Sequence, residues 1–231
     1  ITGLKKHGIN TSSTLTINGG NTTITSAASD GFHSEGYTMT GGIVTITASN
    51  GDGDEAGDRA IAISNGTINI NSTSADVKAI KTGVNTITIL GGTFNLTVSG
   101  AQSKGISAKG SIAISGGTFA VTISGTTVLT ASGSGFDPSY CTAFKSDGNI
   151  VISEGTFTVN ALVGANGGKG FSADGEITIT GGNFTTNTAG NGGTYTNVSG
   201  IADSFSTASF TSDTNINLSG GQFNITNTGA D

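Results

Sequence analysis

The sequence predicts an all-β fold: a single-domain, right-handed parallel β-helix (β-solenoid) of about eight coils, with three short strands in each coil. Glycine pairs recur along the 231 residues, and the segments around them alternate apolar and polar residues with a period of two. Helix-favouring residues are scarce, since Met occurs once and charged residues make up only 10% of the chain. We therefore expect residues 1–231 to form one domain. The glycine pairs are Gly19-Gly20, Gly41-Gly42, Gly91-Gly92, Gly116-Gly117, Gly181-Gly182 and Gly220-Gly221.

Each repeat is expected to contain three strands separated by Gly, Asp and Asn turns. The first strand is clearest at 104–108, 142–146 and 169–173, the second at 111–114 and 176–179, and the third at 93–98 and 118–123. Three strands are too few for a propeller blade, which has four. Stacked repeats pair equivalent strands in parallel, and parallel crossovers are right-handed by default.

Stacking predicts two inward-facing columns of apolar side chains. These columns contain eight of the eleven phenylalanines, which assigns those rings to the core rather than to a ligand surface. The first-strand column is Ile9, Phe32, Ile61, Ile80, Ile106, Phe144, Phe171 and Ile201. The third-strand column is Val44, Ile68, Phe94, Phe119, Phe157, Phe184 and Phe223.

Composition excludes several classes of function. The net charge of -6 argues against a nucleic-acid partner, and no apolar run reaches the roughly 20 residues of a membrane span. The single cysteine, Cys141, excludes an internal disulfide and is expected to be buried. Because the chain starts at Ile1 and shows no signal peptide, we expect a mature or trimmed chain.

The repeat follows the pattern K-G-[IF]-x-A-x-G-x-I-x-I-x-G-G-x-F, clearest at 104–119 and 169–184. It recurs more loosely at 30–44, 78–94, 142–157 and 199–223. This pattern resembles a family of small secreted parallel β-helix carbohydrate-binding proteins from polysaccharide-degrading bacteria, whose coils are similar to those of pectate lyases. The resemblance implies a secreted or cell-surface location. It also implies binding of cellulose or an acidic polysaccharide such as polygalacturonate, with bound calcium and no turnover.

An acidic segment at 50–58 is the candidate metal site. Calcium takes six to eight oxygen ligands from flexible backbone, and alternating Asp and Gly residues supply both features. The alternative is a solvated acidic turn. Asp30 and Glu35 of the preceding coil are expected to stack near this segment. The candidate calcium ligands are Asp30, Glu35, Asp52, Asp54, Glu55 and Asp58.

Basic residues form a second pattern, because the position two residues before the first-strand core residue is often cationic. Lys81 and Lys145 are expected to face outward from the same strands, beside a column of small residues that would form a flat track for an anionic polymer. The alternative is a solvated corner that discourages edge pairing. The candidate polysaccharide-binding cations are Arg59, Lys78, Lys81, Lys104, Lys145 and Lys169.

Aromatic recognition is expected on the two longest loops. Tyr140 lies in the insertion 125–141 and Tyr195 in the excursion 188–198, and loops on a rigid scaffold often carry recognition. Tyr37 is the third tyrosine. The only histidines, His7 and His33, are expected to be exposed or capping residues, because the sequence shows no partners for them.

Three functions remain open. The first is a non-catalytic polysaccharide-binding protein with calcium. The second is a calcium-dependent pectate-type lyase with a lysine base, and the third is a structural or adhesive surface solenoid. The last coil has no polar cap, so we also expect a capping or end-to-end partner there.

Overall fold

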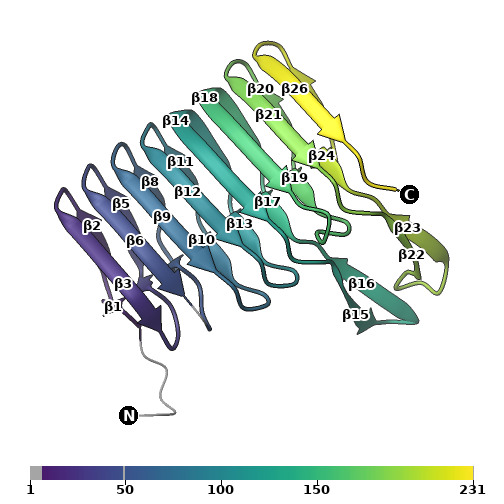
Figure 1. The fold of residues 1–231 in the computed structure, drawn as a ribbon, viewed down its shortest axis with the longest axis horizontal. Coiled ribbons are helices and arrows are strands. Elements are labelled where there is room, and N and C mark those ends of the chain that lie inside the picture. The colour runs from purple at the N-terminus through teal and green to yellow at the C-terminus, as the bar shows by residue number, and fades with distance from the viewer. Residues whose placement is uncertain (1–6, 49, 231) are drawn as a thin grey trace.

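The computed structural model describes residues 7–48 and 50–230. Within these residues the chain forms 26 strands and no helix, which confirms the all-β prediction. Most strands pair in parallel, as a β-solenoid requires, and they stack side by side from the N-terminal to the C-terminal end (Figure 1). The right-handed winding and the number of coils stay predictions.

The first sheet contains eight strands, one from each return of the chain, and every pairing is parallel. Its strands are short because a turn follows each one within a few residues. In spatial order they are β1 (Ile9–Asn10), β4 (Phe32–Ser34), β7 (Asp54–Ala56), β10 (Lys78–Thr82), β13 (Lys104–Ala108), β17 (Thr142–Ser146), β19 (Lys169–Ala173) and β24 (Ala208–Ser212).

The second sheet contains 14 strands in two rows. One row is β2 (Thr14–Ile17), β5 (Gly36–Met39), β8 (Ile61–Ile63), β11 (Ile87–Ile89), β20 (Ile177–Ile179) and β25 (Ile216–Leu218). The other is β3 (Asn21–Ala27), β6 (Ile43–Ala48), β9 (Thr67–Ser72), β12 (Thr93–Val98), β21 (Asn183–Thr188) and β26 (Gln222–Asn227). Two long strands, β14 (Ile112–Ile123) and β18 (Ile150–Ala161), take part in both rows.

Two antiparallel hairpins interrupt this pattern and extend away from the stack in its C-terminal half (Figure 1). The first pairs β15 (Val128–Ser132) with β16 (Gly135–Ser139), and the second pairs β22 (Gly193–Thr196) with β23 (Ala202–Phe205). The first lies within the predicted insertion 125–141, whereas the second begins within the predicted excursion 188–198 and extends beyond it to Phe205. No helix in the described part of the chain is long and apolar enough to cross a membrane.

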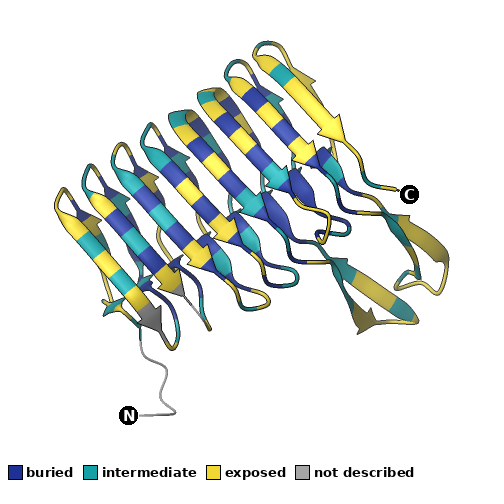
Figure 2. Ribbon diagram, in the orientation of Figure 1, coloured by how far each residue is buried: buried dark blue, intermediate teal, exposed yellow. Residues whose placement is uncertain are grey.

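Phenylalanine stacking fills the core between the sheets. The predicted third-strand column is confirmed from Val44 to Phe223 by the pairing of those strands. Phe119 and Phe157 stack with ring centroids 4.7 Å apart, and Phe157 and Phe184 stack at 4.6 Å. Buried and exposed residues alternate along these strands, as a period of two requires (Figure 2).

The first-strand column differs from the prediction at two positions. Asp54, not Ile61, pairs with Phe32 and Ile80, while Ile61 lies in β8. Phe210, not Ile201, follows Phe171 in the column, and Ile201 is 63% exposed in the second hairpin connection. As a result, Arg59 lies outside the predicted cation column, and Asp52 stands two residues before the column position of that strand.

A run of small residues explains this register. A Cβ on Gly31 would lie 2.5 Å from the Ile46 side chain, and one on Gly53 would lie 2.7 Å from Ile70. These positions therefore face the interior, and the equivalent residues Ala79 and Ala143 are fully buried. The small residues are a packing feature, and the predicted flat outward track is incorrect.

Candidate functional sites

The two hairpins create a cleft beside the C-terminal strands of the first sheet. A backbone bridge between Phe136 and Asn197 connects the hairpins to each other. Tyr140 follows β16 directly, and Tyr195 lies within β22. The cleft has a volume of about 440 Å³. Its lining residues are Asp137, Pro138, Tyr140, Lys145, Lys169, Ser172, Asp174, Tyr195, Thr211 and Asp213.

Phe205 holds the two tyrosines of this tyrosine cleft in place. Its ring centroid lies 6.3 Å from that of Tyr140 and 6.3 Å from that of Tyr195. The ring packs over glycine, because a Cβ on Gly193 would lie 2.6 Å from it. The aromatic pair is thus positioned by both hairpins together.

The cleft is polar as well as aromatic. The Lys145 ammonium lies 2.5 Å from Asp174 and 3.2 Å from Asp147. The Lys169 ammonium lies 4.8 Å from the centre of the Tyr140 ring and donates a hydrogen bond to the Ser206 carbonyl. Burial lowers the pKa of Lys169, and burial together with nearby carboxylates raises the pKa of Tyr140 to about 12. This combination of rings, ammonium groups and carboxylates can stack on a sugar and bind its hydroxyls.

The structure therefore brings together four of the eight predicted polysaccharide-binding residues: Tyr140, Tyr195, Lys145 and Lys169. The third tyrosine, Tyr37, is fully buried in the core. Lys78, Lys81, Lys104 and Arg59 lie elsewhere, each with a partner that explains its position.

Lys78 and Lys104 support turns. The Lys78 ammonium donates to the Asp76 carbonyl at 2.7 Å, and the Lys104 ammonium donates to the Gln102 carbonyl at 2.9 Å. Both acceptor residues have positive φ, 59° at Asp76 and 51° at Gln102, so each lysine stabilises a strained turn. Burial, reinforced by the charge of Lys78, lowers the pKa of Lys104. The Arg59 guanidinium donates to the Thr14 hydroxyl at 3.5 Å.

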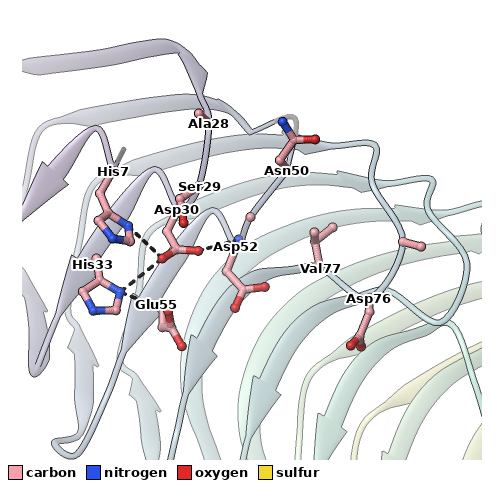
Figure 3. A pocket seen from close by; sticks show the side chains of 12 residues that line it. His7, Ala28, Ser29, Asp30, His33, Asn50, Asp52, Glu55, Asp76 and Val77 are labelled. Carbon is pink, nitrogen blue, oxygen red and sulfur yellow. Dashed lines mark hydrogen bonds and ion pairs between the residues drawn. The ribbon is translucent and has the colours of Figure 1, made fainter. Parts of the chain in front are cut away.

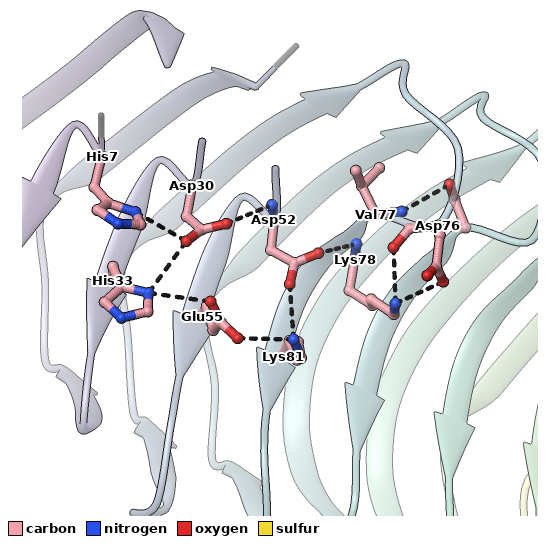
Figure 4. A network of polar contacts seen from close by, with 10 residues as sticks. His7, Asp30, His33, Asp52, Glu55, Asp76, Val77, Lys78 and Lys81 are labelled. Atoms are coloured by element: carbon pink, nitrogen blue, oxygen red, sulfur yellow. Dashed lines mark hydrogen bonds and ion pairs between the residues drawn. The ribbon is translucent and has the colours of Figure 1, made fainter. Parts of the chain in front are cut away.

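At the N-terminal end of the first sheet, three of the predicted calcium ligands converge (Figure 4). The Asp52 amide donates to Asp30 Oδ1 at 2.9 Å, and the Lys78 amide donates to Asp52 Oδ1 at 2.7 Å. Lys81, predicted to bind polysaccharide, instead lies 3.1 Å from Asp52 Oδ2 and 2.7 Å from Glu55 Oε1. Its ammonium group already partly neutralises these carboxylates.

The charges in this cluster shift in consistent directions. Burial raises the pKa of Asp52 more than Lys81 lowers it. Burial also acts on Glu55, but the hydrogen bond and charge of Lys81 hold the pKa of Glu55 below its usual value. The two carboxylates in turn raise the pKa of Lys81 despite its partial burial.

The other three predicted ligands do not join the cluster. Asp54 faces the core and is fully enclosed, and neither carboxylate oxygen has a hydrogen-bond partner among residues 7–48 and 50–230. Burial therefore raises its pKa well above the usual value. Glu35 and Asp58 lie at the opposite end of these strands, beyond the turn at Gly57. The sequence could not predict the inward orientation of Asp54. In a segment of alternating Gly and Asp, the pattern does not tell an inward-facing Asp from an outward-facing one.

His7 and His33 lie in the same cluster, which the sequence analysis did not foresee. Their rings stack with centroids 4.3 Å apart, and the Nδ1 atoms lie 2.9 Å and 3.1 Å from Asp30 Oδ2. His33 Nδ1 is also 3.1 Å from Glu55 Oε2. The spacing in the sequence could have indicated this position. His33 directly follows the core residue Phe32, and strand pairing aligns His33 with Glu55 and Glu55 with Lys81.

This histidine–carboxylate cluster lines a pocket of about 560 Å³ (Figure 3). Its donors suit calcium poorly. Calcium binds six to eight oxygens, whereas the convergent atoms here include two imidazole nitrogens, and an ammonium group contacts two of the three carboxylates. A calcium ion at this position stays a prediction.

The all-β scaffold thus carries a tyrosine-lined polar cleft beside its two hairpins. The chain belongs to the family of carbohydrate-binding domain-containing proteins, whose family model matches residues 1–192 and, overlapping them, 123–231. Overlapping matches agree with an internal repeat, because successive units resemble one another. No curated protein and no solved structure matches the chain. The family supports carbohydrate binding as the activity.

Proposed function

We propose that this protein is a non-catalytic, secreted or cell-surface protein that holds a polysaccharide in the tyrosine cleft. The scaffold would be the right-handed solenoid of about eight coils expected from the repeat. The observation that carries the proposal is the meeting of Tyr140, Tyr195, Lys145 and Lys169 in one cleft, although they come from two hairpins and two strands. Family membership supports the carbohydrate class.

The charge of the cleft favours a neutral glycan. Two lysines and three aspartates line it, and Lys145 is already paired with Asp174. A polyuronate would meet net negative charge there, whereas hydroxyl groups can donate to the carboxylates and accept from the lysines. A cellulose-type or other neutral β-glucan therefore fits better than polygalacturonate.

Lyase chemistry has less support than binding. A lyase needs a desolvated base facing the substrate. Burial lowers the pKa of two lysines, Lys104 and Lys169. The Lys104 ammonium donates to the Gln102 carbonyl and lines neither pocket, and the Lys169 ammonium, which lines the tyrosine cleft, donates to the Ser206 carbonyl.

Affinity electrophoresis through gels containing single polysaccharides tests the proposal. We expect a neutral β-glucan to retard the protein more than polygalacturonate does. Tyr140→Ala and Tyr195→Ala should each weaken binding by about two- to tenfold, since an aromatic contact contributes about 0.5–1.5 kcal/mol. The matched control is Phe136→Ala, which removes an exposed ring from the same hairpin but outside the cleft lining.

Two results would contradict the proposal. One is unchanged mobility of the wild-type protein in every gel. The other is equal retardation of the wild type and both tyrosine variants, which would place glycan binding elsewhere. Stronger retardation by polygalacturonate, with loss in the tyrosine variants, would keep the site and overturn the neutral ligand class.

A further inference from the structure

We propose that His7, Asp30, His33 and Glu55 form a binding site for a divalent transition-metal ion such as Zn²⁺, and that this ion joins the first three strands of the first sheet. The inference is independent of the tyrosine cleft. It rests on how four donor atoms are placed, how each carboxylate is held, and what charge the cluster carries.

Donor atoms of His7, Asp30 and His33 all lie within 4.8 Å of one another, and Glu55 Oε2 lies beside the His33 member of this group. His7 Nδ1 lies 2.9 Å from Asp30 Oδ2, and His33 Nδ1 lies 3.1 Å from both Asp30 Oδ2 and Glu55 Oε2. Tetrahedral Zn²⁺ with bonds near 2.0–2.1 Å separates its ligand atoms by about 3.3 Å. The distances from His7 and His33 to Asp30 are close to this value, and Glu55, which lies beside His33, would complete the site by moving toward the other three donors. Figure 3 shows both imidazole rings directed at Asp30 from adjacent strands.

Hydrogen bonding alone leaves this arrangement incomplete. His7 Nδ1 is buried and does not meet the geometry of a hydrogen bond, although Asp30 Oδ2 is 2.9 Å away. His33 Nδ1 can carry one proton but faces two carboxylate oxygens. A shared cation satisfies all four atoms together.

Each ligating carboxylate is held through its other oxygen. Asp30 Oδ1 accepts from the Asp52 amide at 2.9 Å, which directs Oδ2 toward the histidines. Glu55 Oε1 accepts from Lys81 at 2.7 Å, which leaves Oε2 facing His33 (Figure 4). Such outer partners orient ligands at metal sites, and the Asp30 side chain is only 10% exposed.

Charge and donor type select the class of metal. Asp30, Asp52 and Glu55 carry three negative charges and Lys81 carries one positive charge, so the cluster has a formal charge of -2 with neutral histidines. A divalent cation neutralises it. Two imidazoles with two carboxylates suit Zn²⁺ and similar metals, whereas calcium and magnesium prefer oxygen ligands alone.

The ion would act as a cross-strand clamp. His7 precedes β1, and Glu55 lies in β7. Asp30 lies just before β4, and His33 lies within it. β1 has only two residues and pairs with one neighbour, so it has few other contacts to hold it. Binding to the folded state alone stabilises it in proportion to the logarithm of metal concentration.

Metal binding is tested with tag-free, EDTA-treated protein titrated with Zn²⁺, Ca²⁺ and, as a spectroscopic probe, Co²⁺. We expect micromolar or tighter Zn²⁺ binding at one equivalent, visible Co²⁺ d–d bands of tetrahedral type, and no comparable Ca²⁺ binding. Zn²⁺ at 100 times its Kd should raise Tm by about 5 °C or more.

Variants separate this site from other acidic groups. His33→Gln should weaken Zn²⁺ binding by about 100-fold or more, since loss of even an outer partner costs about 10- to 100-fold. Glu35→Gln and Asp58→Asn remove carboxylates of the same sequence segments that lie outside the cluster, and they should bind like the wild type. The proposal is overturned by failure of the wild type to bind Zn²⁺, by Ca²⁺ binding as tight as Zn²⁺ binding, or by equal losses in His33→Gln and the two control variants.

Discussion

Asp54 is the residue whose position is hardest to reconcile with stability. It occupies a column position between Phe32 and Ile80, and its carboxyl group has no hydrogen-bond partner in the part of the chain that the structure describes. Burying an unpaired polar group costs about 1–3 kcal/mol. Asp54→Val should therefore raise the free energy of unfolding by about 1–3 kcal/mol, measured by urea denaturation followed by circular dichroism.

The neighbouring position provides the control for this substitution. Ile80→Val introduces the same residue one strand away and should lower stability by about 0.5–1.5 kcal/mol, because it removes a buried methylene. If Asp54→Val lowered stability as well, the Asp54 carboxyl group would have a stabilising partner, such as a buried water molecule.

At the scale of strands, the sequence predicted repeats well and local register less well. The third-strand column was predictable because four of its five phenylalanines follow glycine pairs at constant spacing, and Phe157 follows Glu154-Gly155 at the same spacing. The prediction misplaced β7 because it assigned the inward column position to the apolar Ile61 rather than to Asp54. In the structure the interior glycines Gly31 and Gly53 set the alignment of this strand. Close backbone packing outweighed the polarity of one side chain.

The same comparison explains the sites. Tyr140 and Tyr195 were predictable as loop residues. Their proximity was not, because it depends on pairing between two hairpins that do not follow the repeat pattern. The histidine–carboxylate cluster required the corrected register, which puts Asp52 next to Asp30 and Glu55 next to His33. A one-element error in alignment was enough to hide it.

The hairpins also give a prediction of their own, which rests on the proposed function. Phe205 contacts both cleft tyrosines but lies outside the core of the sheets. Phe205→Ala should weaken glycan binding by about tenfold while changing Tm by less than about 3 °C, because only the hairpins lose packing. Tyrosine fluorescence on glycan titration measures the affinity, and a large fall in Tm would show that the hairpins support the whole stack.

For the whole molecule, the two sites share one sheet but lie at different ends of it. The histidine–carboxylate cluster uses β1, β4 and β7, and the tyrosine cleft borders β17, β19 and β24. Lys81 of β10 also contacts the cluster, so one strand, β13, separates the two sites, and with strands about 4.8 Å apart their nearest strands are roughly 10 Å apart. The intervening strand is continuously paired and tightly packed, which gives no element with two alternative arrangements to couple the sites.

Glycan binding and metal binding should therefore be additive. Removal of metal with EDTA should leave the affinity for glycan within about twofold, and Tyr195→Ala should leave the Zn²⁺-induced rise in Tm unchanged, since distant sites without shared partners act independently. A double-mutant cycle of His33→Gln and Tyr195→Ala, with glycan affinity as the readout, measures the coupling directly. The contradicting result is a tenfold loss of glycan affinity on metal removal from the wild type but not from His33→Gln. The ion would then take part in glycan recognition, and the polysaccharide would have to extend along the first sheet from one site to the other.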